Sequence, residues 1–161
     1  MAKKVNITFI KDNLIVEDSD LAHDLFNTSA LGTKTEESIN YSLMEAFYLL
    51  QKSKAEIKDG RGAKVDEKTF LKRARRLEPN FRTRYIVFKD LRDRGYVVKT
   101  ALKFGADFRV YDRGIKPGED HAKWVVFPVR EGNTLTWHDF SAKNRVAHST
   151  KKKLLLGIVD D

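Results

Sequence analysis

The chain has 161 residues, of which 41% are hydrophobic and 34% are charged, and it contains no cysteine. This length and balance exclude a disordered tail and allow one globular unit or two small ones, each with a buried core. The lack of cysteine excludes disulfide scaffolds, thiol nucleophiles and cysteine-ligated zinc, and we expect a cytoplasmic protein without a signal peptide or a membrane span.

The net charge of +8 is unevenly distributed along the chain. Residues 1–50 sum to −4, residues 51–100 to +9 and residues 101–161 to +3. Such an excess indicates a polyanionic partner, although a solvated helix face explains the charge alone equally well. A membrane surface is less favoured, because the basic helices carry the apolar stripe of a globular core.

The first half of the chain alternates short strands with helices. Ser42 and Glu45 have the spacing of a capping box, which opens a helix. The expected elements are strands at residues 5–10 and 14–18 joined by a turn at 11–13, a helix from Ser19, a helix from Ser42, a strand at 55–60, a polar loop at 61–64 and a helix at 66–78.

A longer amphipathic helix is predicted between Pro79 and Gly95, because apolar residues recur there every three or four positions. We place the domain boundary at its start, which gives domains at residues 1–80 and 81–161. The elements expected after this helix are strands at residues 96–102, 104–113, 121–130 and 152–160, and a helix at 136–148.

The predicted strand at 104–113 separates a tyrosine from the apolar residues. Its even positions from Phe104 to Val110 are apolar. The odd positions from residue 107 onward hold Asp107, Arg109, Tyr111 and Arg113. Because side chains alternate between the faces of a strand, we expect Tyr111 to point out of the core. The other interpretation is a tyrosine packed in the core with its hydroxyl at the rim.

The segment 112–120 is rich in turn residues and predicts an antiparallel hairpin with a long loop. In that arrangement Tyr111 and His121 lie at facing strand ends. Paired positions are about 4.5–5.5 Å apart at Cα, so both side chains reach one small substrate group if they share a face. A histidine at the start of a strand is otherwise usually a surface residue.

Three lysines, Lys151, Lys152 and Lys153, lead directly into the last predicted strand. Alternation puts Lys152 on the face opposite its two neighbours, so that it can enter a site that they do not. The alternative is a lysine cluster that keeps a sheet edge soluble.

A tyrosine, a histidine and a lysine suit the cleavage of RNA by its own 2′-hydroxyl. That reaction needs a base near the hydroxyl, an acid for the departing 5′-oxygen and a cation for the charge that develops on phosphorus. Histidine can supply the acid and lysine the cation. A phenol is a weak base unless cations stabilise its phenolate, for which Arg109, Arg113 and Lys152 are candidates; otherwise the tyrosine orients the substrate.

Three motifs in the second half, "GADFRVYDRG", "HAKWVV" and "RVAHSTKKKLLLGIVD", together with "SLMEAFYLLQKSKAEI" in the first half, resemble the archaeal tRNA-splicing endonucleases. The resemblance implies that Tyr111 is the general base, His121 the general acid and Lys152 the residue that stabilises the transition state. It also implies that Arg145 grips a base of the substrate.

The resemblance implies a metal-independent endonuclease without a cofactor. Such an enzyme excises introns from precursor tRNA at bulge-helix-bulge motifs and leaves a 2′,3′-cyclic phosphate and a 5′-hydroxyl. We expect further RNA contacts from the basic residues around the triad, Arg109, Arg113, Lys151 and Lys153.

The resemblance also implies assembly, as a homo-oligomer or with related subunits. Asp160 and Asp161 match the start of an acidic loop that contacts a neighbouring subunit. The chain stops there, so we expect the catalytic domain to lack the family's last strand. The implied fold class is α/β of the α+β type, with an N-terminal domain of mixed sheet and helices and a C-terminal nuclease domain whose mixed, largely antiparallel sheet is flanked by helices.

Three other functions remain open at this point. The chain could be a non-catalytic structural subunit of such an assembly or a basic RNA-binding module. A metal-dependent nuclease would use Asp107 with Asp112 or Glu119, although these residues do not form a convincing ligand set.

Overall fold

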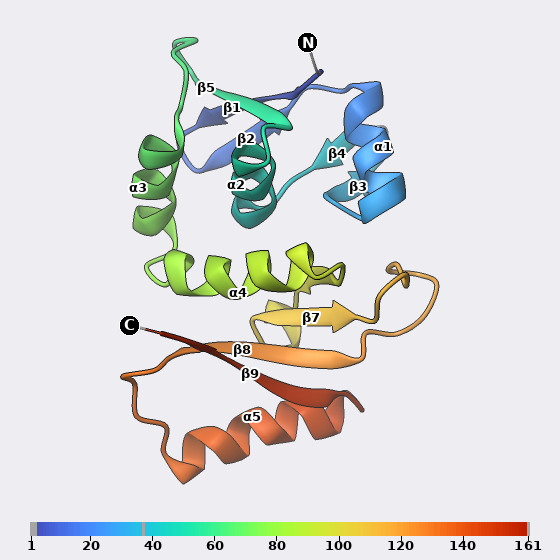
Figure 1. Cartoon of the computed structure of the whole chain (residues 1–161), viewed down its shortest axis with the longest axis vertical. Coiled ribbons are helices and arrows are strands. Elements are labelled where there is room, and N and C mark those ends of the chain that lie inside the picture. The colour runs from blue at the N-terminus through green and yellow to red at the C-terminus, as the bar shows by residue number, and fades with distance from the viewer. Residues whose placement is uncertain (1–2, 37, 161) are drawn as a thin grey trace. The chain divides into compact units, whose positions relative to one another are not determined.

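A computed structural model describes residues 3–36 and 38–160 of the chain. The chain divides into two compact units, Met1–Arg82 and Thr83–Asp161 (Figure 1). The elements of the first unit are β1 (Val5–Ile10), β2 (Asn13–Val16), α1 (Asp20–Ser29), β3 (Thr33–Thr35), β4 (Ser38–Asn40), α2 (Leu43–Gln51), β5 (Ala55–Asp59) and α3 (Glu67–Leu77). Helix α4 (Phe81–Asp93) crosses the division, and the second unit continues with β6 (Val97–Thr100), the 3-10 turn η1 (Leu102–Phe104), β7 (Phe108–Tyr111), β8 (Trp124–Arg130), α5 (Trp137–Ser149) and β9 (Lys153–Val159).

A mixed sheet of order β2-β1-β5 lies at the centre of the first unit. Strand β1 pairs antiparallel with β2 and parallel with β5. Alternate residues of β1 are buried, as the sequence pattern predicts. The core is aromatic: the ring of Phe70 stacks on Phe47 at 5.3 Å between centroids and also contacts Phe9 and Phe81.

The helices of the first unit begin at the predicted caps. Ser19 caps α1, and the capping box of Ser42 and Glu45 opens α2. The Glu45 carboxylate is buried and also accepts a hydrogen bond of 2.7 Å from the backbone N–H of Gly32. Burial, followed by the charge of Glu45, raises the pKa of Tyr41 to about 12.

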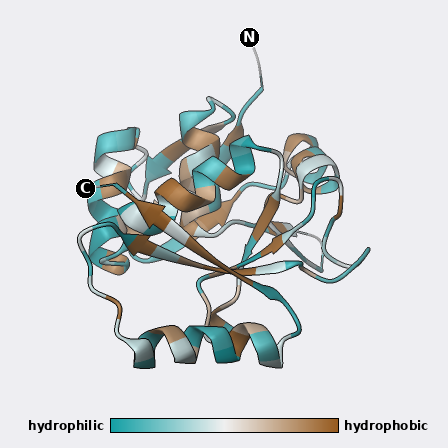
Figure 2. Ribbon diagram, turned by 60° about the horizontal axis from the view of Figure 1, so that its bottom comes forward, coloured by the Kyte–Doolittle hydropathy of each residue, from teal (hydrophilic) through white to brown (hydrophobic). Residues whose placement is uncertain are grey.

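The second unit is built on a sheet whose described strands have the order β6-β7-β8-β9. The pairs β6–β7 and β7–β8 are antiparallel, and β9 runs parallel to β8 after the crossover through α5. Helices cover both faces of the sheet: α4 contributes Phe88, which contacts Phe108, and α5 contributes Ala147, which packs on Val125 and Phe127 (Figure 1). Hydrophobic residues are concentrated in the strands between the helices (Figure 2). The structure therefore confirms the mixed, largely antiparallel sheet with flanking helices.

Two predicted features of the second unit were wrong. The strand expected at 104–113 begins only at Phe108, because residues 102–104 form η1 and Gly105 follows in a left-handed conformation with φ of 83°. The strand expected at 121–130 begins at Trp124, so the hairpin loop is longer than predicted.

None of the helices in the described part of the chain has the length and apolarity to cross a lipid bilayer.

Candidate active site

Tyr111 and Lys152 lie in one row across an end of the sheet. Tyr111 is the last residue of β7, and Lys123 and Lys152 directly precede β8 and β9. The backbone N–H of Lys123 donates to the carbonyl of Val110, and the N–H of Lys153 donates to the carbonyl of Lys123, both at 2.9 Å. Continuing the strand register by one residue therefore aligns Tyr111, Lys123 and Lys152. With strands about 4.8 Å apart, the backbones of Tyr111 and Lys152 are separated by about 10 Å.

Tyr111 and Lys152 belong to the face of the sheet that packs against α5, whereas the ammonium of Lys123 lies 4.8 Å from the centre of the Trp124 ring. Val110, Trp124 and Leu155 line a groove on the other face. The residues that alternate with them therefore point toward α5, and Leu154 indeed packs into the core beneath that helix.

Arg109 holds the Tyr111 hydroxyl on this face. Its Nε donates a hydrogen bond of 3.1 Å to the phenol oxygen, and its Nη1 donates at 2.7 Å to the carbonyl of Thr100. Both nitrogens thus engage the protein, so Arg109 fixes the position of the phenol.

The prediction that Tyr111 points out of the core was wrong, because only 6% of the residue is exposed. Alternation correctly separates Tyr111 from the apolar residues Phe108 and Val110 of β7, but its own side of the strand is buried as well. The burial agrees with the other interpretation, in which the ring is packed.

His121 is exposed and lies in the loop between β7 and β8. Its backbone N–H donates to the Asp120 carboxylate at 2.7 Å. The expected pairing of Tyr111 with His121 was wrong, because the later start of β8 puts Lys123 opposite Tyr111. His121 is two residues from Lys123, so their Cα atoms are at most about 7 Å apart.

The environment of Lys152 differs from that of its neighbours. Lys152 is half-buried, and its Nζ donates to the carbonyl of Thr150 at 3.4 Å, whereas Lys151 and Lys153 are exposed. Lys151 has a φ of 56° and belongs to the turn that follows α5, so the lysine run does not enter the strand until Lys153. Arg145 is exposed on α5, the helix that precedes this turn.

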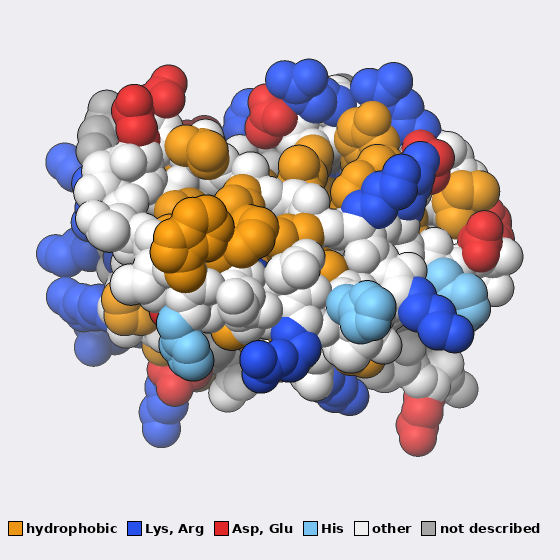
Figure 3. Space-filling view, turned by 90° about the horizontal axis from the view of Figure 1, so that it is seen from below, with side chains coloured by type: hydrophobic (Ala, Val, Ile, Leu, Met, Phe, Trp, Pro, Cys, Tyr) orange, Lys and Arg blue, Asp and Glu red, His pale blue; other side chains and the backbone are white. Residues whose placement is uncertain are grey.

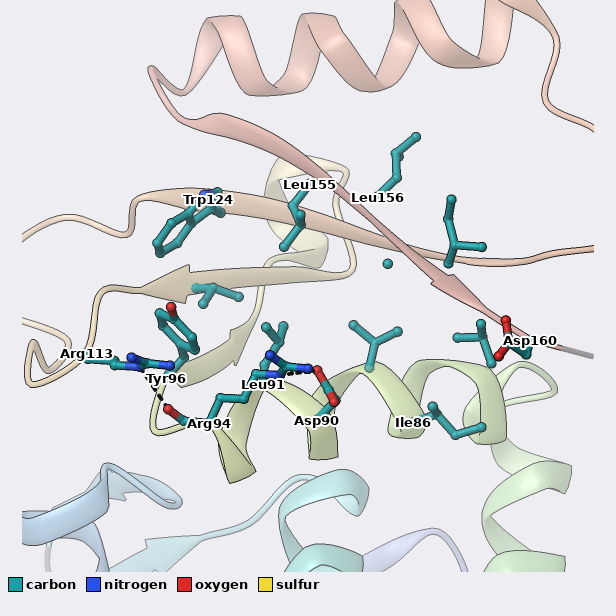
Figure 4. A pocket seen from close by; sticks show the side chains of 15 residues that line it. Ile86, Asp90, Leu91, Arg94, Tyr96, Arg113, Trp124, Leu155, Leu156 and Asp160 are labelled. Carbon is teal, nitrogen blue, oxygen red and sulfur yellow. Dashed lines mark hydrogen bonds and ion pairs between the residues drawn. The ribbon is translucent and has the colours of Figure 1, made fainter.

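Arg113 is directed away from Tyr111, contrary to its expected role beside the phenol. Its guanidinium carbon lies 4.8 Å from the centre of the Tyr96 ring, and its Nε donates to the carbonyl of Arg94 at 2.9 Å. Figure 4 shows these side chains at one end of the groove on the α4 face, which has a volume of about 760 Å³. Asp160 lines the same groove, and Asp161 lies outside the described residues.

The acidic residues considered as metal ligands have other partners. The Asp107 carboxylate lies 2.9 Å from Nε of Arg84, and that of Asp112 lies 3.4 Å from Nζ of Lys123. The N–H of Arg113 and the charge of Lys123 lower the pKa of Asp112, and Glu119 accepts a hydrogen bond from the N–H of Lys116. Within residues 3–36 and 38–160, acidic and histidine side chains do not gather in groups of three suited to a metal ion.

The sequence interpretation missed Lys123. It is exposed, and its backbone lies in the row between Tyr111 and Lys152, while its ammonium lies 3.4 Å from the Asp112 carboxylate. The motif "HAKWVV" contains it, but its position depends on where β8 begins, and the length of the hairpin loop sets that point.

Comparison with known proteins covers both units. Residues 5–71 match the family model described as tRNA intron endonuclease, N-terminal domain, and residues 81–161 match that of the catalytic C-terminal domain. The relatives named tRNA-splicing endonuclease include one from Nanoarchaeum equitans, 49% identical over 74% of this chain and 80% of its own. The relative from Thermococcus kodakarensis is 41% identical over 93% of this chain and 87% of its own length. The relative from Methanothermobacter thermautotrophicus is 38% identical over 91% of this chain and 84% of its own length. The chain therefore belongs to the tRNA intron endonuclease family, and its second unit is the catalytic domain.

Proposed function

We propose that this enzyme excises introns from precursor tRNA at bulge-helix-bulge motifs, without a metal ion, and leaves a 2′,3′-cyclic phosphate and a 5′-hydroxyl. The relatives' name, tRNA-splicing endonuclease, supports the substrate. The observation that carries the chemistry is the row of Tyr111, Lys123 and Lys152 at one end of the sheet, with His121 two residues from its centre.

In the proposed reaction, the 2′-oxygen of the substrate attacks the adjacent phosphorus. The new O2′–P bond forms as the P–O5′ bond breaks, so water is not consumed. Tyr111 accepts the proton of the 2′-hydroxyl or orients that group, and His121 donates a proton to the departing 5′-oxygen. The ammonium of Lys152 stabilises the negative charge on the phosphoryl oxygens in the transition state.

The exposed cations around this end of the unit are the proposed RNA contacts. Arg145 grips a base, and Lys151 and Lys153 bind backbone phosphates. Because Arg109 is engaged by Tyr111 and Thr100, we assign it to positioning rather than to RNA binding.

An intron has two ends, so its removal requires two cuts. We propose that two or more subunits, identical or related, supply the two sites, with Asp160 and Asp161 in a contact between subunits. We also propose that the enzyme acts in the cytoplasm.

The test is cleavage of an intron-containing precursor tRNA in excess chelator, followed by mass spectrometry of the new ends. We expect undiminished cleavage, with a 3′ end lighter by one water than a linear phosphate. Loss of activity that Mg²⁺ restores would support the metal-dependent alternative. Tight binding without cleavage would indicate a structural subunit or an RNA-binding module.

A further inference from the structure

Trp137 is the most exposed of the large hydrophobic side chains at the described positions, with 85% of the residue open to solvent. It is the first residue of α5 and forms an edge-to-face pair with Phe140, with 6.2 Å between ring centres and 89° between ring planes. Phe140 is 37% exposed. Aromatic residues bury large areas when they serve the core, so an exposed pair on a well-formed helix indicates a binding surface.

The rest of the exposed face of α5 is polar or cationic. Asn144 and His148 follow Trp137 at helical spacing, and Arg145 is exposed beside them. Figure 3 looks onto the side that carries α5 and shows a cluster of hydrophobic side chains and, apart from it, lysine, arginine and histidine side chains.

The acidic charge of α5 is confined to Asp139, at its first turn. The Asp139 carboxylate accepts a hydrogen bond of 3.2 Å from the N–H of Thr136 in the capping box. This bond ties the carboxylate to the start of the helix, and the following three turns carry only neutral or basic side chains. The face is therefore complementary to a polyanion.

The helix also connects the aromatic pair to the proposed site. Trp137 and His148 are eleven positions apart on α5, a distance of about 17 Å along the axis, and the turn to Lys152 follows. A nucleic-acid strand that leaves the site along α5 passes Arg145 and then reaches Trp137.

We infer that Trp137 and Phe140 form a stacking platform for an RNA base of the substrate, away from the scissile phosphate. The inference rests on the proposed function, because it takes RNA as the ligand. Unpaired or terminal bases stack on exposed aromatic rings, and nearby cations hold the backbone. A stable protein interface buries about 800 Å² on each partner, far more than two aromatic side chains present, so RNA is the favoured occupant.

The experiment measures how tightly the wild type and its variants bind an intron-containing RNA. The 2′-hydroxyls at the cleavage sites of this RNA are replaced by hydrogen, so that it is bound but not cut. The variants are Trp137→Leu, which keeps an apolar side chain without a ring, and Trp137→Tyr, which keeps a ring. Ile15→Ala is the control, because Ile15 is 56% exposed but belongs to the first unit.

We expect Trp137→Leu to weaken binding by about 5- to 100-fold. Trp137→Tyr should restore most of the affinity and Ile15→Ala should leave it unchanged. The slope of log Kd against log salt should stay that of the wild type, because a stacking contact does not neutralise a phosphate. The single-turnover cleavage rate at saturating RNA should also be unchanged.

The inference would be overturned if Trp137→Leu bound the RNA as tightly as the wild type. It would also be overturned if light scattering showed that Trp137→Leu changes the molar mass, because that result would identify a subunit interface. Thermal unfolding of each variant verifies that it folds. Cleavage of the normal RNA by the wild type tests the proposed function separately. If the wild type cleaves this RNA and Trp137→Leu binds RNA as tightly as the wild type, only the stacking platform is refuted.

Discussion

The Nε of Arg109 donates a hydrogen bond of 3.1 Å to the hydroxyl oxygen of Tyr111. The phenol oxygen therefore accepts from the protein, and its own hydrogen is free to be donated to the substrate. The geometry of the Tyr111 oxygen depends on Arg109, whose Nη1 is anchored on the carbonyl of Thr100 at 2.7 Å.

Arg109→Ala should slow cleavage at saturating RNA on the order of 10²-fold, because a displaced phenol no longer meets the 2′-hydroxyl in the productive geometry. RNA affinity should change little, since the guanidinium is engaged within the protein. Single-turnover kinetics and filter binding separate the two effects. A loss of affinity as large as the loss of rate would instead make Arg109 an RNA contact.

His121→Ala should slow cleavage by roughly 10²–10⁴-fold while leaving RNA affinity almost unchanged, as expected for removal of a general acid. His23→Ala is the matched control, because His23 pairs with Asp18 at 2.7 Å in the first unit. An RNA with a good leaving group in place of the 5′-oxygen should restore most of the rate to His121→Ala. If affinity and rate fall together, the assignment of His121 as the acid is wrong.

Gly157→Ala should destabilise the protein by about 1–3 kcal/mol, because a methyl group there would lie 2.9 Å from both methyl carbons of Val87. The effect is steric, since the glycine does not have a positive φ. Denaturant unfolding of Gly157→Ala, Val87→Ala and the double variant gives the coupling between them. We expect Val87→Ala to recover part of the loss, and strictly additive changes would contradict the predicted collision.

Asp59→Asn should reduce the sensitivity of the fold to acid. Hydrogen bonds from the N–H groups of Arg61 and Ala63, at 2.8 and 3.0 Å, lower the pKa of Asp59 below its usual value of about 3.9. A carboxyl that is more acidic in the folded state stabilises it above that usual value, and the contribution is lost as the pH falls through the folded-state pKa.

The measurement for Asp59 is Tm at about pH 7 and about pH 3. The fall in Tm between them should be smaller for Asp59→Asn than for the wild type, because the amide does not titrate. An equal fall in both proteins would show that Asp59 does not contribute to the acid dependence.

Local signals in the sequence predicted much of the fold. Ser42 with Glu45 marks the start of α2, and the alternation of β1 marks a strand whose observed bounds are those predicted. The hairpin of β3 and β4 was not anticipated, because its strands have three residues each and only Ile39 among them is a buried apolar residue. Such a hairpin depends on its surroundings and not on its own pattern.

The site was harder to predict than the elements. The side of the strand that carries Tyr111 follows from alternation, but its burial does not, because the pattern of one strand does not show that both of its sides are covered. Lys123 took the place expected for His121 because the loop length decides which residue meets Tyr111. Arg113 turned to Tyr96 because an aromatic face and a backbone carbonyl are available there. Non-local packing therefore sets the details that the sequence pattern does not contain.

The parallel pairing of β9 with β8 has a consequence for biosynthesis. Tyr111 and His121 leave the ribosome well before Lys152, and the ammonium joins them only after α5 has folded back and the closing strand has added to the sheet. A nascent chain that ends within α5 thus carries the phenol and the imidazole without their cation. If the proposed roles hold, RNA cleavage by this domain therefore begins only after α5 and β9 have been synthesised.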